Sequence, residues 1–175
     1  MFDIYLTSVG RGSTLFLNIP PDQRGLFNEL DVQSLKGFRD LLNKIFADNL
    51  AENAAVTATS YRGKAKEYAP ANITDGKENT YWATDDAAKT GSVEITLNKK
   101  SIVQYIMLQE YIQLGQRVKS FSVDVWKDNA WQTAAAATTI GYKRILKITP
   151  VETNKIRVNI LVSKACPVIS NIEIY

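Results

Sequence analysis

The stretch ANITDGKENTYWATDD, from Ala71 to Asp86, is the most informative part of this chain. Asp75 offers a carboxylate, Gly76 permits the positive φ of a sharp turn, and Thr80 can give both its hydroxyl and its carbonyl to one ion. Oxygen ligands of this kind suit calcium. The stretch combines a tight turn, a tryptophan and the ingredients of a calcium site, which is typical of a loop in a β-sandwich.

A β pattern occupies the rest of the chain after this loop. Apolar and polar residues alternate over Ser92 to Leu97, Phe121 to Val125 and Ile156 to Val162. Asp128-Asn129, between two tryptophans, predicts a hairpin turn. Roughly six to eight short strands at this spacing predict a mainly β fold, an antiparallel β-sandwich.

The first part of the chain has a different pattern. Residues 14–19 form a nearly continuous apolar run, typical of a strand buried on both faces. From about residue 28 to residue 46, apolar side chains recur every three or four positions, which predicts an amphipathic helix capped by Asn28 or Asp31. We therefore expect a strand and helix over residues 1–50 and a sandwich over residues 51–175.

A lone strand and helix cannot cover both faces of such a strand. The unit therefore looks cut from a larger α/β protein. The alternative is that both elements pack onto the sandwich. An apolar strand left exposed at residues 14–19 tends to associate, so a homodimer through this strand is also expected.

Composition excludes several classes of function. Hydrophobic residues make up 45% of the chain and charged residues 22%, which is typical of a globular domain with a real core. The net charge of +3 comes from interspersed residues, so no basic stripe predicts binding to nucleic acid. No apolar run approaches the ~20 residues of a membrane span.

Two residue counts exclude further chemistry within this chain. There is no histidine, which excludes Ser-His-Asp and Cys-His arrangements. Cys166 is the only cysteine, which excludes an internal disulfide and a cysteine zinc site. We expect Cys166 to be a half-buried structural residue.

Longer motifs resemble one family. GRGSTLFLNIPPDQRG (residues 10–25) and the following helix resemble the end of the catalytic barrel of glycoside hydrolase family 29 α-L-fucosidases. LQEYIQLGQRVKSF (108–121), TTIGYKRIL (138–146) and SKACPVIS (163–170) resemble the C-terminal discoidin-like domain of a subgroup of those enzymes, which is related to carbohydrate-binding module family 32. The resemblance implies a discoidin-like (galactose-binding-like) sandwich after a strand–helix remnant of a (β/α) barrel.

The resemblance also implies a function. It indicates a non-catalytic carbohydrate-binding or barrel-supporting C-terminal module of an α-L-fucosidase that acts on fucosylated glycans. The paired carboxylates of such a retaining glycosidase, about 5 Å apart, would come from earlier barrel strands, so this chain is not expected to cleave a glycoside. The implied partners are a fucose- or galactose-containing glycan and the missing catalytic barrel.

Other readings remain beside this one. The chain could be a purely structural interdomain module without affinity for sugar. A free-standing adhesion module is less favoured, because the loops carry Lys, Arg, Glu and Gln rather than exposed apolar tips. The compartment of this chain is open, whereas the parent enzyme would be secreted or periplasmic.

The resemblance places a structural calcium ion, for which sodium could substitute, at the loop quoted first. Its ligands would be the carboxylates of Asp75 and Glu173, the hydroxyl and carbonyl of Thr80, and the backbone carbonyls of Asn72, Lys77 and Ile172. The alternative is an Asx turn, in which Asp75 only accepts hydrogen bonds from local amides.

Six residues are candidates for sugar contact: Trp82, Glu110, Tyr111, Arg117, Tyr142 and Arg144. Aromatic faces pack on pyranose rings, and arginine offers a donor fork for neighbouring hydroxyls. Trp82 could instead fill the core beneath its loop. The loop residues could instead contact the missing barrel, with Glu110 and Arg117 paired across the joint.

Overall fold

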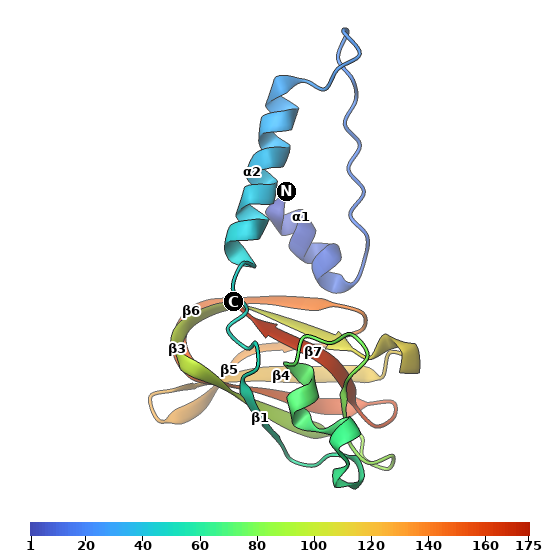
Figure 1. The fold of residues 1–175 in the computed structure, drawn as a ribbon, viewed down its shortest axis with the longest axis vertical. Coiled ribbons are helices and arrows are strands. Elements are labelled where there is room, and N and C mark those ends of the chain that lie inside the picture. The colour runs from blue at the N-terminus through green and yellow to red at the C-terminus, as the bar shows by residue number, and fades with distance from the viewer.

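The computed structural model describes all 175 residues, as two N-terminal helices followed by one antiparallel sheet that folds over into a sandwich (Figure 1). The sheet has the hydrogen-bonded order β2-β7-β3-β6-β4-β5, with β1 paired to β3. The elements are α1 (Phe2–Thr7), α2 (Glu29–Ile45), β1 (Ala55–Ala58), β2 (Trp82–Ala83), β3 (Gly91–Glu110), β4 (Val118–Lys127), β5 (Ala130–Ala137), β6 (Arg144–Ser163) and β7 (Val168–Ile174), with short 3-10 turns between them.

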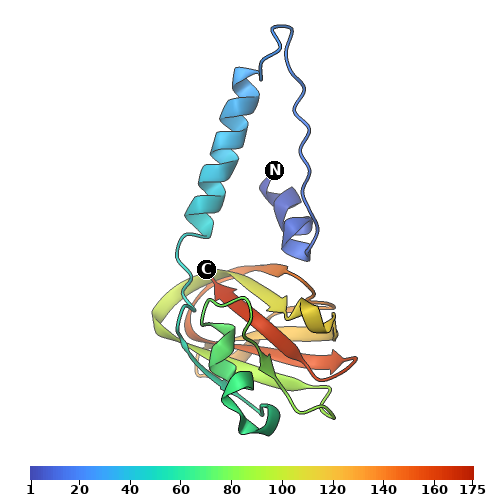
Figure 2. The ribbon, with the colours of Figure 1, turned by 45° about the vertical axis from the view of Figure 1, so that its right-hand side comes forward.

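Two long strands join the two layers of the sandwich. β3 and β6 are 20 residues each and pair with one another along most of their length. Their register is interrupted between Thr96 and Ser101, where the ladder bends. Before this bend β3 pairs with β1, and after it β3 pairs with β7. Each long strand therefore belongs to one layer at its start and to the other at its end (Figure 2).

The core lies between the layers and follows the predicted alternation. Val93 and Ile95 of β3, Phe121 and Val123 of β4, and Ile156 of β6 are at most 1% exposed. Their neighbours in sequence are more exposed, except Asp124, which is buried at 6% exposure. The predicted antiparallel sandwich is confirmed.

The β4–β5 hairpin is confirmed as well. Lys127 pairs with Ala130 across the turn. Asp128 and Asn129 both adopt positive φ angles, of 53° and 58°. A two-residue turn with both residues left-handed is the type I′ turn, whose twist matches that of the flanking strands.

The predicted helix is present as α2. It begins after Asn28, whose side chain accepts a hydrogen bond of 2.9 Å from the N–H of Leu30, so Asn28 rather than Asp31 is the cap. The helix is amphipathic, yet none of its residues is buried. It stands away from the sandwich in both ribbon views (Figures 1 and 2).

The predicted strand at residues 14–19 is wrong. The chain is extended there but forms no strand, because no neighbouring strand lies beside it to exchange backbone hydrogen bonds. Phe16 is 89% exposed. The residues before it, which we left without a predicted element, form α1. The apolar pattern of a strand was present, but its partners were not.

The N-terminal arm, residues 1–50, contacts the sandwich only at its base. Phe46 packs edge-on against Tyr105 and Tyr175, with ring centroids 5.9 and 5.0 Å apart. Gly10 is buried against Ile145, where an added Cβ would lie 3.2 Å from the Ile145 Cβ. The alternative prediction, that the first part of the chain packs onto the sandwich, is therefore correct only for the base of the arm.

The upper part of the arm exposes apolar side chains. Leu30 is 71% exposed, Leu26 60% and Phe27 58%. Such a cluster is unusual on the surface of a monomeric domain. No helix of the structure is both long and apolar enough to cross a bilayer.

Replacing Phe121 by Ala should lower the free energy of unfolding by about 3 to 5 kcal/mol, because Phe121 is fully buried between the layers. Phe16→Ala is the matched control, and its effect should stay within about 0.5 kcal/mol. Urea unfolding followed by tryptophan fluorescence measures both. Equal effects of the two variants would contradict the described core.

Candidate functional site

A buried carboxylate organises the loops at one end of the sandwich. Glu110, at the end of β3, is 2% exposed. Its Oε1 accepts hydrogen bonds from the N–H groups of Arg117 (2.7 Å) and Val118 (2.9 Å), and its Oε2 accepts one from the N–H of Gly141 (2.7 Å). This side chain therefore ties the start of β4 and the loop before β6 to the end of β3.

The bonding of Glu110 corrects two expectations. The carboxylate is buried and already accepts three main-chain hydrogen bonds, so it is not available to a sugar. It also does not pair with the Arg117 guanidinium, since only the backbone N–H of Arg117 reaches it. Glu110 and the three N–H groups that donate to it, which we call the clamp, instead fix the segments that carry Tyr111, Arg117 and Tyr142.

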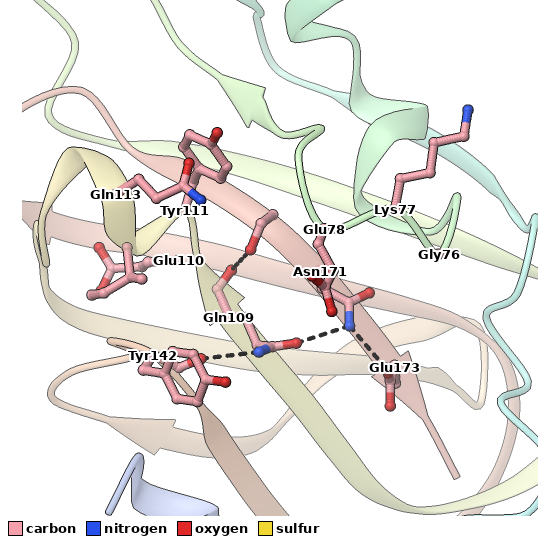
Figure 3. Close-up of a pocket in the computed structure, with 12 residues that line it drawn as sticks. Gly76, Lys77, Glu78, Gln109, Glu110, Tyr111, Gln113, Tyr142, Asn171 and Glu173 are labelled. Carbon is pink, nitrogen blue, oxygen red and sulfur yellow. Dashed lines mark hydrogen bonds between the residues drawn. The ribbon is translucent and has the colours of Figure 1, made fainter.

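A polar groove of about 350 Å³ lies beside these hydrogen bonds of Glu110, between the end of β3, β7 and the loop at Gly76 to Glu78 (Figure 3). A chain of side-chain hydrogen bonds runs along it. Asn171 donates to Gln109 Oε1 (3.0 Å) and to Glu173 Oε1 (2.8 Å), and Gln109 donates to the carbonyl of Tyr142 (3.1 Å). Two amides and one carboxylate therefore lie in a row along the groove.

Three of the predicted sugar contacts line the groove: the buried Glu110 and the tyrosines Tyr111 and Tyr142. Tyr142 is 60% exposed and lines it from the loop before β6. Tyr111 lines it from the end of β3 and stacks on Tyr81 at a centroid distance of 4.4 Å. Tyr81 in turn contacts Tyr68, at 5.6 Å. The structure thus brings Tyr111 and Tyr142 together on one concave surface.

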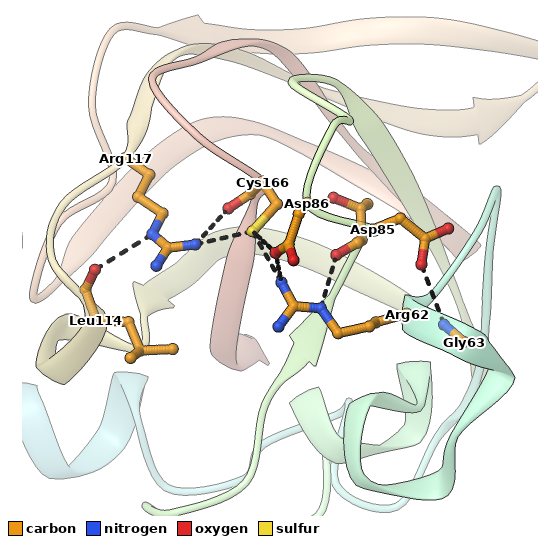
Figure 4. A network of polar contacts seen from close by, with 8 residues as sticks. Arg62, Gly63, Asp85, Asp86, Leu114, Arg117 and Cys166 are labelled. Carbon is orange, nitrogen blue, oxygen red and sulfur yellow. Dashed lines mark hydrogen bonds and ion pairs between the residues drawn. The ribbon is translucent and has the colours of Figure 1, made fainter.

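Arg117 points away from the groove. Its Nη1 donates to the carbonyl oxygen (3.0 Å) and to the sulfur (2.9 Å) of Cys166 (Figure 4). Arg62 donates to the same sulfur at 3.1 Å and pairs with Asp86. Cys166 is 3% exposed, so it is more deeply buried than we expected. These contacts hold together four segments of the chain, around residues 62, 86, 117 and 166.

Trp82 is not available for stacking on a sugar. It is 0% exposed, within the core beneath its loop. Its indole N–H donates to the carbonyl of Ser60 at 3.0 Å, so the polar atom of the ring is satisfied inside. The alternative stated from the sequence, a core tryptophan, is the correct one.

Arg144 lies outside the groove as well. Its Nε is buried and has no acceptor. Burial, and to a smaller extent the nearby Arg11, lowers the pKa of the Arg144 guanidinium from its ordinary value. Because Arg11 belongs to the base of the arm, Arg144 lies at the junction of arm and sandwich.

The loop proposed for calcium forms the Asx turn that we considered as the alternative. Asp75 Oδ1 accepts from the N–H of Lys77 at 3.0 Å. The Thr80 hydroxyl lies 2.9 and 3.1 Å from the two Asp75 oxygens and 3.2 Å from the Lys77 carbonyl oxygen. The single proton of the Thr80 hydroxyl cannot be donated to three acceptors at once. The hydrogen bonds of this turn therefore do not account for all the close contacts among its four oxygens.

The other predicted metal ligands include two backbone carbonyls, those of Asn72 and Ile172, which stay a prediction. The Asn72 side chain donates to the carbonyls of Glu67 and Tyr81, and Ile172 is a buried residue of β7. Glu173 accepts from Asn171 and from the Tyr175 hydroxyl. Burial is the largest cause that raises the pKa of the Tyr175 hydroxyl, and its hydrogen bond to Glu173 is the second. No three Asp, Glu or Cys side chains cluster as metal ligands.

Sequence reasoning missed Gln109, Ser170 and Asn171 as groove residues. Gln109 and Asn171 are cross-strand partners of β3 and β7, which are far apart in the chain. The alternating pattern of β7 marks Asn171 as outward-facing, but it does not identify the strand that lies beside it.

Comparisons with known proteins agree with this fold. The family model described as the F5/8 type C domain matches residues 55–173. Alpha-L-fucosidase 1 of Arabidopsis thaliana is 32% identical over the whole of this chain, which covers 35% of that protein. The chain therefore spans about a third of the length of this curated relative.

Solved structures give the same result. A Ruminococcus gnavus glycoside hydrolase family 29 fucosidase, solved in complex with fucose, is 32% identical with a TM-score of 0.91, over 99% of this chain and 35% of that one. A chitosan-binding module from a Paenibacillus chitosanase/glucanase shares the fold, with a TM-score of 0.65 at 21% identity, over 73% of this chain and 98% of the module. The resemblance to the C-terminal portion of family 29 fucosidases is confirmed.

Replacing Glu110 by Ala should destabilise the protein by about 3 kcal/mol or more, because three N–H groups lose their acceptor, two of them in buried bonds. Hydrogen exchange at Val118 and Gly141 should accelerate most. Glu78→Ala, an exposed carboxylate at the rim of the groove, should change stability by less than about 0.5 kcal/mol. A Glu110→Ala protein as stable as Glu78→Ala would contradict the clamp.

Proposed function

The chain belongs to the F5/8 type C domain family, and we propose that it is the non-catalytic carbohydrate-binding module of an α-L-fucosidase. Its ligand in this proposal is a fucose- or galactose-containing glycan. The site is the groove between Tyr111, Tyr142, Gln109, Asn171 and Glu173.

The hydrogen-bond chain of the groove is the observation that carries this proposal. Gln109, Asn171 and Glu173 alternate donors and acceptors along one surface, which matches the alternating donor and acceptor capacity of sugar hydroxyls. Tyr142 offers an exposed ring at the rim. A concave surface with a few convergent polar groups is the usual form of a small-ligand site.

The test is a titration of the 175-residue protein with methyl α-L-fucopyranoside and methyl β-D-galactopyranoside, followed by ¹H–¹⁵N NMR. We expect saturable shifts of the Gln109 and Asn171 side-chain amides. Tyr142→Ala should weaken binding by about tenfold, since the ring supplies the apolar contact.

Phe16→Ala removes an exposed aromatic ring outside the groove and should leave the affinity unchanged. Absence of any shift with both sugars would refute the binding proposal. That outcome would favour the second candidate, a purely structural module.

The exposed arm supports a barrel-supporting role beside sugar binding. Phe16, Leu26, Phe27 and Leu30 form an apolar surface that the sandwich does not cover. The relatives are about three times longer than the matched region. We propose that a catalytic barrel covers this surface in the parent enzyme. The alternative is that a second copy of this chain covers the surface in a homodimer. Gel filtration of this chain distinguishes a dimer from a monomer.

In this proposal the chain has no glycosidase activity of its own. Incubation with 4-nitrophenyl α-L-fucopyranoside should give no 4-nitrophenol above the uncatalysed rate. Turnover that follows the protein through purification would contradict the assignment as a non-catalytic module.

We further propose a structural calcium ion at Asp75 and Thr80. The support is the convergence of the two Asp75 oxygens and the Lys77 carbonyl on the Thr80 hydroxyl, since calcium accepts six to eight such oxygens. Glu173 would have to give up its bonds to Asn171 and Tyr175 to join them. Sodium would bind to the same oxygens with lower affinity.

Calcium at 100 times its dissociation constant should stabilise the protein by about 2.7 kcal/mol, because it binds only the folded state. Asp75→Asn should abolish this gain, while Asp31→Asn on α2, a matched change at an exposed carboxylate, should retain it. Thermal unfolding with calcium and with EDTA measures the effect. An unchanged melting temperature of the unsubstituted protein would exclude the ion.

A further inference from the structure

A second polar hollow lies at the other end of the sandwich, where the β3–β6 ladder bends. It has a volume of about 510 Å³ and shares no lining residue with the groove. Trp126, Asp128 and Asn129 line it from the β4–β5 hairpin, and Lys100, Glu152 and Asn154 line it from the bend. Lys100 and Gln109 are separated by roughly 30 Å along β3, so the two hollows lie far apart.

The walls of this hollow are fixed by the fold. Thr153, which is 1% exposed, donates its hydroxyl to the carbonyl of Trp126 at 2.8 Å and thereby ties β6 to the end of β4. The Trp126 ring contacts Trp131 edge-on at 5.3 Å, and the Arg157 guanidinium lies 4.3 Å from the Trp131 ring centre. Arg157 is held in turn by Asp124, at 2.9 Å. These contacts therefore hold the half-buried Trp126 in place.

The charges around the hollow cancel. Lys100 and Lys127 supply two positive charges, and Asp128 and Glu152 supply two negative ones. Lys100 and Glu152 pair directly, at 3.0 Å. A balanced set of this kind does not favour an anion or a cation, but it offers both donors and acceptors to a neutral ligand.

One aromatic residue belongs to the lining of this hollow. Asn129 and Asn154 each add an amide, which can donate and accept, and the half-buried Trp126 lines the same hollow. A flat ring that carries hydroxyls on its edge satisfies both features, because its face packs on indole and its hydroxyls reach the amides and carboxylates. A neutral pyranoside has this shape.

We propose that this hollow is a second carbohydrate-binding site, for a neutral pyranose unit, with Trp126 as its stacking residue. The site is separate from the groove and does not depend on the function proposed for it. With both sites filled by one branched or extended glycan, the second contact is intramolecular, and the combined affinity exceeds that of either site.

The test follows the three indole N–H signals of the intact 175-residue protein by NMR during titration with methyl β-D-galactopyranoside, methyl α-L-fucopyranoside and sodium glucuronate. We expect saturable shifts of the Trp126 indole with at least one neutral sugar, and no such shift with glucuronate. The buried Trp82 is an internal control that should not move. Trp126→Ala should weaken binding at this site by about tenfold.

Two further variants separate the sites and guard against misfolding. Glu152→Ala changes an exposed side chain and should weaken the Trp126 response by at least about threefold without loss of the fold. Tyr142→Ala, in the groove, should leave the Trp126 response unchanged. A Trp126 signal unmoved by both neutral sugars, or moved equally by glucuronate, would overturn the proposal, whereas a silent Gln109 alone would count only against the groove.

Discussion

The long antiparallel ladder between β3 and β6 is the constraint on which the rest of this structure depends. Because the ladder bends between Thr96 and Ser101, its two halves belong to different layers, and every other strand pairs directly or indirectly with one of them. The two polar hollows lie at the ends of the second half of β3. Lys100 marks the bend, and Gln109 marks the far end. The second hollow thus depends on the β3–β6 pairing, whereas the groove depends also on the pairing of β3 with β7.

Buried polar groups then fix the loops around that ladder. Glu110 accepts three main-chain hydrogen bonds, and Thr153 joins the end of β4 to β6. Cys166 receives two arginines from different loops. An unmade hydrogen bond costs more inside a protein than on its surface, so such groups hold loops in one arrangement. The exposed Tyr142 and the half-buried Trp126 are positioned by these neighbours.

The N-terminal arm follows a different rule. Its base is stabilised by aromatic packing of Phe46 on Tyr105 and Tyr175, while its upper part exposes Phe16 and Leu30. Hydrophobic burial drives folding in proportion to the area removed from water, and this surface remains in water. The sandwich has a buried core of its own, whereas the upper part of the arm keeps apolar side chains exposed.

The sequence by itself determined the helix at residues 29–45, the alternating strands and the Asp128-Asn129 turn, since these depend on neighbours within a few positions. It also determined the family, through motifs such as TTIGYKRIL. The burial of Trp82 was among the sequence-based expectations, but the missing partner strand of residues 14–19 and the main-chain hydrogen bonds of Glu110 were not. Those two points, and the placement of Gln109 next to Asn171, come from the tertiary structure. The reason is physical: a local pattern shows which way a side chain faces, but the register of distant strands decides what it meets there.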